Sequence, residues 1–246
     1  MRYLSANTLK TIAIITMLID HTAEAMVGPE TALYVIMRFI GRITAPIMFY
    51  FIVEGYFYTR DKNKYAIRLG VFALVSYLPF VWFISGGIPD FMSYFRLNVI
   101  YTLFIGLSAL RVIHEMEESK WKRLALAGLI LLSLPGDWSA IAILYIITFD
   151  RYRGDFPKQA KAYLIVTLLT GAADFLYPVI VALGGQSVEV KYIVNALINL
   201  GRFLPIGLLY FYNGEKGRGG KWSQWGFYIF YPLHLIILCY LANMLK

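Results

Sequence analysis

The sequence predicts an all-α membrane protein, a polytopic bundle of about nine transmembrane helices. Of the 246 residues, 59% are hydrophobic and only 15% are charged, whereas a soluble domain is usually nearer a quarter charged. The hydrophobic residues also lie in long runs that Gly, Pro and charge clusters separate. At about 20 apolar residues for each crossing, the length leaves no room for a separate soluble domain. We therefore expect residues 1–246 to form a single integral-membrane domain.

The candidate helices are nine apolar runs, which we take in chain order. They cover residues 8–27, 32–58, 66–84, 94–114, 123–134, 138–149, 160–183, 190–212 and 224–245. Two of these runs, 123–134 and 138–149, have only about 12 residues each, or roughly 18 Å of helix, against a hydrocarbon core of roughly 30 Å. The pair 123–149 is expected to form either a re-entrant hairpin or two short spans buried in protein. Pro46 predicts a kink inside the second run, because it frees the carbonyl of Arg42.

The basic residues alternate along the chain in a way that predicts the topology. They occupy every second loop: Arg60, Lys62 and Lys64; then Arg111, Lys120, Lys122 and Arg123; then Arg151, Arg153, Lys158 and Lys161; and last Lys216, Arg218 and Lys221. The positive-inside rule then places the N-terminus in the cytoplasm and the C-terminus outside. This pattern explains the net charge of +8 better than a nucleic-acid surface does, so no nucleic-acid partner is expected.

Ionisable side chains inside the apolar runs mark the candidate functional site. At the centre of a transmembrane helix a charge costs at least about 2.5 kcal/mol, so such groups normally pair, face the bundle or do chemistry. In chain order they are Asp20, His21, Glu24, Arg38, Arg42, Glu54, Asp174, Arg202 and His234. Asn195, Asn199 and Arg202 are spaced i, i+4 and i+7, so they form one polar stripe on a helix.

The first run has a polar stripe of its own. Lys10 and His21 are 11 residues apart, which places them within about 20° of one helical face and roughly 16 Å apart along the axis. With the N-terminus inside, Lys10 lies at the cytoplasmic mouth and His21 lies beyond the midplane. A cavity between them would offer a cation at its entrance and a titratable imidazole at depth.

A structural interpretation competes with this functional one. His21 can simply hydrogen-bond a neighbouring helix, and Asp20 and Glu24 can be the buried partners of Arg38 and Arg42. The three histidines of the chain, His21, His114 and His234, lack any metal-ligand spacing, and no nucleotide-binding motif is present. We therefore expect no metal.

Three blocks of sequence, LKTIAIITMLIDH (Leu9 to His21), RFIGRITAPIMFYFIVEGYFYTRDKNKYAIRL (Arg38 to Leu69) and FYIFYPLHLIIL (Phe227 to Leu238), resemble the TraX family. That family is named for the protein that N-acetylates conjugative pilin. More distantly, the blocks resemble the membrane acyltransferase-3 proteins that O-acylate cell-surface polysaccharides.

The likeness to the acyltransferase-3 proteins rests on a few positions. Those proteins carry a basic residue, ten intervening residues and then a histidine, which matches Lys10 and His21, and a late Tyr-Leu-x-His, which matches His234. This chain departs from them with Lys10 where they have Arg, and with Glu54 where they have Ser.

The resemblance implies acyl transfer from acetyl-CoA or another acyl-CoA, with His21 as the general base. Under this hypothesis Asp20, Glu24 or Glu54 orients the imidazole, and Lys10 and Arg68 hold the CoA phosphates. Arg42, Asn199 or Arg202 stabilises the thioester oxyanion, and Arg38 and His234 complete the expected acyl-CoA-binding set.

The acceptor of the acyl group stays open between a peptide amine such as a pilin N-terminus, a sugar hydroxyl and a lipid-linked headgroup. The expected location is a bacterial inner membrane, with the lipid bilayer as surroundings. Two rival functions remain: a proton-coupled transporter of small molecules or lipids, and a non-catalytic membrane assembly factor.

Overall fold

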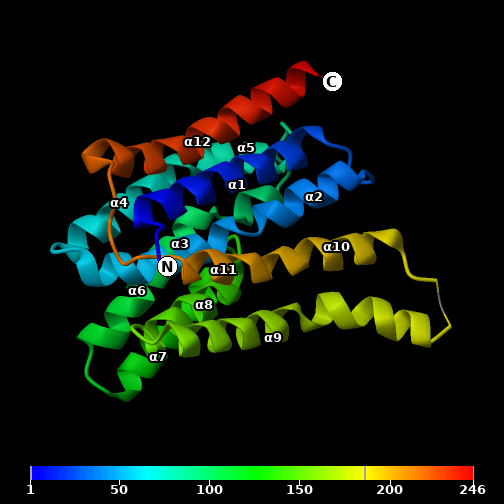
Figure 1. Ribbon diagram of the computed structural model, residues 1–246. Helices are drawn as coiled ribbons and strands as arrows, with labels where there is room; N and C mark the ends of the chain where they lie inside the picture. Colours follow the sequence, from blue (N-terminus) through cyan, green and yellow to red (C-terminus); the bar gives the residue numbers. More distant parts are fainter. Residues whose placement is uncertain (1, 186, 246) are drawn as a thin grey trace. The chain divides into compact units, whose positions relative to one another are not determined.

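A computed structural model of the protein describes residues 2–185 and 187–245, and in these ranges it is helical without a β-sheet. The elements follow the order drawn in Figure 1: α1 (Ala6–Met26), α2 (Ala32–Gly41), α3 (Thr44–Tyr58), α4 (Lys62–Val75), α5 (Tyr77–Ile84), η1 (Met92–Phe95), α6 (Val99–Glu115), α7 (Lys120–Ser133), α8 (Ser139–Arg151), α9 (Phe156–Leu183), α10 (Val190–Leu200), η2 (Gly201–Phe203), α11 (Leu204–Tyr210) and α12 (Gly220–Met244). The all-α prediction is confirmed.

Three of the predicted runs are broken into two helices, and a proline accounts for each break. Pro46 lies in the first turn of α3, Pro79 in the first turn of α5 and Pro205 in the first turn of α11. Proline has no N–H to donate to the preceding turn, but it is tolerated in the first turn of a helix. A new helix therefore starts just before each proline. At the second break, α4 and α5 are bent by 43°.

Four helical stretches of the described residues are long and apolar enough to cross a membrane, or five if the bent pair α4 and α5 forms one span. The four are Ala32–Tyr58, Phe156–Leu183, Val190–Tyr210 and Trp225–Met244. The protein therefore has the helices of a membrane protein. Nine crossings and a cytoplasmic N-terminus stay predictions.

The chain divides into two compact units, each built from two segments of sequence. Unit 1 is Met1–Ile47 with Gly154–Gly217, and unit 2 is Met48–Arg153 with Arg218–Lys246. Unit 1 holds α1, α2, α9, α10, η2 and α11, while unit 2 holds most of α3 together with α4 to α8, η1 and α12. The single domain expected from the sequence stays a prediction, and the units are described separately.

In unit 1, α2 packs against α1 and α10, and α10 packs against α9 (Figure 1). The start of α1 is fixed by the segment that follows α11. The backbone N–H of Ala6 donates to the carbonyl of Glu215 at 2.8 Å, and that of Asn7 donates to Lys216 at 3.0 Å. These bonds satisfy N–H groups in the first turn of α1, which have no partner within the helix.

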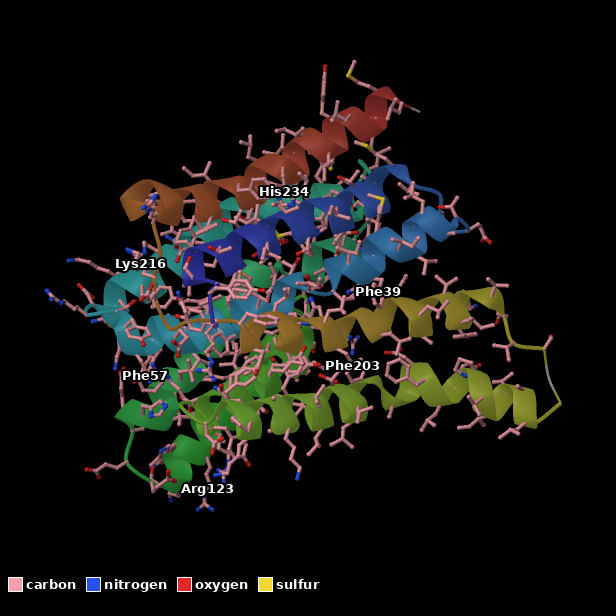
Figure 2. The ribbon with its side chains drawn as sticks, viewed as in Figure 1. Phe39, Phe57, Arg123, Phe203, Lys216 and His234 are labelled. Carbon is pink, nitrogen blue, oxygen red and sulfur yellow. The ribbon has the colours of Figure 1, made fainter. Side chains whose placement is uncertain are left out.

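Two glycines allow the close approach of helices to α2. A Cβ on Gly41 would lie 2.0 Å from the Oδ1 atom of Asp20 in α1, and a Cβ on Gly201 would lie 2.1 Å from the carbonyl oxygen of Phe39 in α2. Phe39 is labelled in Figure 2. Any larger residue at these two positions would push α1 or η2 away from α2.

In unit 2, α6 is the central helix, because α4, α7 and α8 all pack against it. At its N-terminal end the N–H of Leu97 donates to Pro135 at 2.8 Å, and the Thr102 hydroxyl donates to the carbonyl of Asp137 at 2.7 Å. At its C-terminal end, His114 bonds Asp150 of α8. The short pair 123–149 is thus a helical hairpin whose second helix follows α6 from end to end.

Replacing Gly201 with Ala should destabilise unit 1, because the added methyl would meet the backbone of α2 and has nowhere to move. Overpacking of this kind costs about 1–3 kcal/mol. We expect Gly201→Ala to lower the unfolding temperature of the protein purified in detergent. Gly207→Ala is the matched control, since a Cβ there has nothing within 4 Å; equal melting of the two variants would contradict the close contact.

Candidate functional site

The structure divides the eleven predicted site residues between the two units. Unit 1 holds Lys10, Asp20, His21, Glu24, Arg38, Arg42, Asn199 and Arg202, and unit 2 holds Glu54, Arg68 and His234. Unit 1 therefore contains most of the predicted site, spread over α1, α2, α10 and η2.

Arg38 in the last turn of α2 pairs with two carboxylates of α1. Its Nη1 atom lies 3.0 Å from Oδ2 of Asp20 and also forms an ion pair with Glu24. Asp20 and Glu24 are four residues apart, so they lie on one face of α1 and can share a single guanidinium. The structural pairing that the sequence allowed is thus observed for Arg38.

His21 follows Asp20 and lies about 100° further round α1, so its side chain leaves the helix in another direction. It is half-buried, as is Lys10 nearer the start of the same helix. Arg42 caps the C-terminal end of α2, and its Cβ would lie 3.1 Å from a Cβ built on Gly201. Arg42 therefore stands at the contact between α2 and η2, against Gly201, the residue that precedes Arg202.

A second set of polar contacts joins α9 to α10. Asn199, which is 6% exposed, donates from Nδ2 to Oδ2 of Asp174 at 3.0 Å. An Nη2 atom of Arg202 lies 3.9 Å from the same oxygen, and the Tyr163 hydroxyl donates to the Arg202 carbonyl. Through Gly201 this set adjoins the C-terminal end of α2.

The three predicted residues of unit 2 have partners of their own. Glu54 is 8% exposed and accepts a hydrogen bond from Nε of Arg153 at 2.8 Å. His234, labelled in Figure 2, donates from Nδ1 to the carbonyl of Phe230 one turn earlier at 2.8 Å, and the two rings stack. Arg68 lies on α4 with its guanidinium 5.7 Å from the ring centre of Tyr65.

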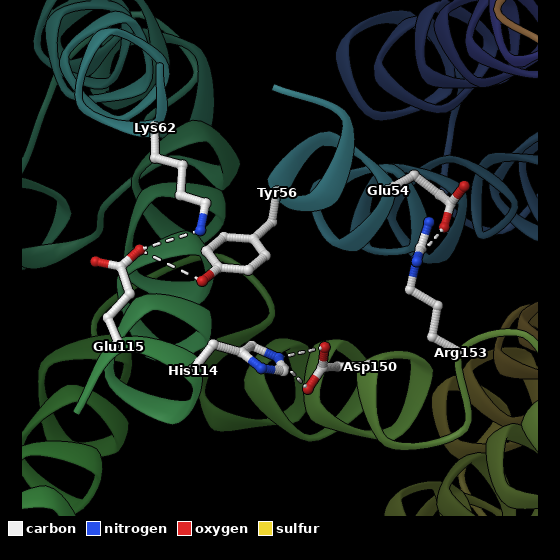
Figure 3. Close-up of polar contacts among 7 residues, drawn as sticks. All are labelled: Glu54, Tyr56, Lys62, His114, Glu115, Asp150 and Arg153. Atoms are coloured by element: carbon white, nitrogen blue, oxygen red, sulfur yellow. Dashed lines mark hydrogen bonds and ion pairs between the residues drawn. The ribbon is translucent and has the colours of Figure 1, made fainter. Parts of the chain in front are cut away.

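A cluster that the sequence analysis missed lies at the ends of α3, α6 and α8 in unit 2 (Figure 3). Nε2 of His114 lies 2.8 Å and 3.0 Å from the two carboxylate oxygens of Asp150. These two residues are 36 positions apart. Both lie at the ends of apolar runs, beside the Lys and Arg clusters that the sequence analysis explained by membrane topology. Only their pairing in three dimensions marks them.

Aromatic rings hold this cluster together. The ring of Tyr56 stacks on His114 with 5.3 Å between centroids, and its hydroxyl donates to Oε1 of Glu115 at 3.3 Å. The ammonium of Lys62 lies 4.0 Å from the centre of the Tyr56 ring and 3.5 Å from Glu115. Phe57, also labelled in Figure 2, packs its ring against His114 from a second side.

The chemistry open to these sites is proton transfer and recognition of anions. Each of the three candidate carboxylates, Asp20, Glu24 and Glu54, is paired with an arginine. Across residues 2–185 and 187–245, no three side chains of His, Cys, Asp or Glu are grouped so that they could hold a metal ion.

Comparisons with known proteins agree with the motif blocks. The chain matches the family described as TraX protein over residues 5–242. A curated relative, the probable fimbrial assembly protein FimC, serogroup H1, of Dichelobacter nodosus, is 32% identical over 243 residues, which cover 96% of this chain and 94% of the relative. No solved structure matches the chain. The resemblance found in the sequence is thus confirmed, and the chain belongs to the TraX family.

Proposed function

We propose that the protein is a membrane acyltransferase that takes an acetyl or other short acyl group from acyl-CoA, bound from the cytoplasmic side, to an amine or hydroxyl of a peptide or envelope acceptor. Membership of the TraX family supports this proposal. The relative in Dichelobacter nodosus is described as a probable fimbrial assembly protein, which favours a subunit of fimbriae as the acceptor. The setting proposed is the inner membrane of a bacterium.

The observation that carries the choice of base is the pairing of the carboxylates with arginines. Asp20 and Glu24 both engage Arg38, so their role is to neutralise a guanidinium between α1 and α2. His21 lies between them in sequence, and histidine is the side chain whose ordinary pKa is nearest to neutral pH. We therefore assign proton abstraction to His21.

The proposed step begins when His21 takes the proton from the attacking amine or hydroxyl of the acceptor. A positioned base of this kind contributes about 10²–10⁴-fold to the rate. The oxyanion formed from the thioester needs hydrogen-bond donors, and we assign this role to Arg42, Asn199 and Arg202, which lie on either side of the contact at Gly201. The CoA thiolate then leaves, and the acceptor keeps the acyl group.

Replacing His21 with Ala should abolish transfer, because no other group of α1 would take the acceptor proton. The measurement is incorporation of label from radiolabelled acetyl-CoA into acceptors of native membrane vesicles, with CoA release followed in parallel. We expect a loss of at least about 100-fold.

Leu18→Ala, on the exposed side of the same helix, is the matched control for this variant. If His21→Ala labels acceptors as well as Leu18→Ala does, His21 is not the base. If the unaltered protein consumes no acyl-CoA but moves a solute into vesicles, the alternative function of a transporter is correct. An assembly factor would show neither activity while its deletion still prevented assembly of fimbriae.

The ion pairs of Arg38 should contribute to stability separately from any catalysis. Removing one partner of a buried ion pair costs about 3–5 kcal/mol, because the other charge is left uncompensated. Arg38→Gln should therefore destabilise the protein strongly, and adding Asp20→Asn should recover part of the loss. A double-mutant cycle of unfolding free energies measures this coupling, and strictly additive effects would contradict the pairing.

A further inference from the structure

The histidine missed by the sequence analysis has the geometry of a reactive imidazole. A carboxylate only accepts hydrogen bonds, so Nε2 of His114 is the donor to Asp150; the ring proton of neutral His114 is therefore on Nε2, and Nδ1 keeps a lone pair. The Asp150 side chain is 7% exposed, whereas that of His114 is 34% exposed. The carboxylate is therefore shielded behind a ring that a substrate can reach.

The imidazole is also held in a fixed orientation. It stacks on Tyr56 with an angle of 26° between the ring planes, and Phe57 packs its ring against it at 74°. Tyr56 is only 2% exposed, so the ring on which the imidazole stacks is itself held in place by packing. Reactive side chains need such support, because a loss of orientation lowers the rate.

An exposed guanidinium also lies over the Phe57 ring. The Cζ atom of Arg153 is 4.2 Å from the centroid of that ring, and its Nε is bonded to the buried carboxylate of Glu54. The Arg153 side chain is 31% exposed, and its two terminal nitrogens offer the fork geometry that binds phosphate. A phosphate-binding cation and a reactive imidazole therefore flank one aromatic ring (Figure 3 shows both side chains).

We propose that unit 2 carries a second reaction centre, in which Arg153 binds the phosphate of a phosphopantetheine thioester and His114, oriented by Asp150, accepts its acyl group. Acyl-CoA and an acyl carrier protein both present this chemistry. The inference rests on the proposed function and adds to it a covalent acyl-enzyme stage. Lys62 and Arg153 belong to two of the basic clusters whose positions along the sequence predict the cytoplasmic side, where both donors are found.

The reaction balances in two steps. Nδ1 of His114 attacks the thioester carbonyl carbon, the carbon–sulfur bond breaks, and its electron pair leaves with the sulfur as a thiolate. The Asp150 carboxylate stabilises the acyl-imidazolium that forms, which keeps its Nε2 proton, and the thiolate leaves with its electron pair and takes a proton from water. In the second step the acceptor, whose proton goes to the general base, attacks the acyl carbon; the carbon–nitrogen bond breaks, and its electron pair returns to Nδ1 to regenerate neutral His114.

The first step can be tested without knowing the acceptor. Purified full-length protein is mixed with acetyl-CoA and labelled CoA, and the exchange of label into acetyl-CoA is measured beside the intact mass of the protein. We expect exchange together with one acetyl group on the protein that hydroxylamine removes. His114→Asn should abolish both, and Asp150→Asn should slow the exchange by about 100-fold or more.

Controls separate this inference from the proposed function. Glu117→Gln, an exposed carboxylate near the same end of α6, should exchange as the unaltered protein does, and melting temperatures establish that the variants fold. The second centre is wrong, and the acyltransferase stands, if the unaltered protein labels acceptors but carries no acetyl group and His114→Asn labels acceptors equally well. If the unaltered protein uses neither acetyl-CoA nor an acetyl-loaded carrier protein, both fail. Loss of exchange in His21→Ala but not in His114→Asn would also overturn the inference.

Arg153 should affect binding of the donor more than the chemical step. Arg153→Gln removes the guanidinium and should raise the KM for acetyl-CoA by about 10-fold or more, since a charged hydrogen bond contributes about 1.5–3 kcal/mol, with a much smaller change in kcat. Arg153→Lys keeps the charge and should restore part of the affinity. Comparing acetyl-CoA with the acetyl-loaded carrier protein identifies the donor. An unchanged KM for both donors in Arg153→Gln would overturn the phosphate site.

Discussion

The ion pairs that Arg38 makes with Asp20 and Glu24 constrain the rest of unit 1. Removing one partner of a buried ion pair leaves an uncompensated charge at a cost of about 3–5 kcal/mol, so α1 and α2 meet where these three residues lie. Gly41 makes that contact possible, because it has no side chain to hold Asp20 away. Gly201 brings the end of α10 against α2, where Asp174 of α9 pairs with Asn199 and Arg202.

How the chain divides into helices was largely predictable from hydropathy, whereas the breaks and neighbours were not. Apolar runs report which residues avoid water, and each run of this chain is helical. Whether a proline kinks a helix or starts a new one depends on the carbonyls of the preceding turn and on what packs there. The 12-residue runs were ambiguous for a related reason: only the bonds of Leu97 and Thr102 to the turn between α7 and α8 show that the hairpin follows α6 throughout.

The candidate site was predictable where opposite charges lie in consecutive helices, as with Asp20 and Arg38. It was not predictable where the partners are distant in sequence, as with Glu54 and Arg153, which are 99 residues apart. The positive-inside rule already explained the position of Arg153, so nothing in the sequence pattern indicated its contact with the buried carboxylate of Glu54. The same ambiguity concealed His114 and Asp150. A residue that fits the membrane topology can also be part of a functional site.

The surroundings of His234 and His114 argue for different roles. His234 donates to a carbonyl of its own helix and is stacked on Phe230, which is typical of a buried structural side chain. His114 is backed by a carboxylate and remains reachable. The phosphates of CoA cannot enter hydrocarbon without a large cost, whereas an acetyl group is small and uncharged. If the acceptor lies beyond the membrane, a covalent stage on a histidine therefore solves a physical problem, since only the acyl group has to leave the aqueous side.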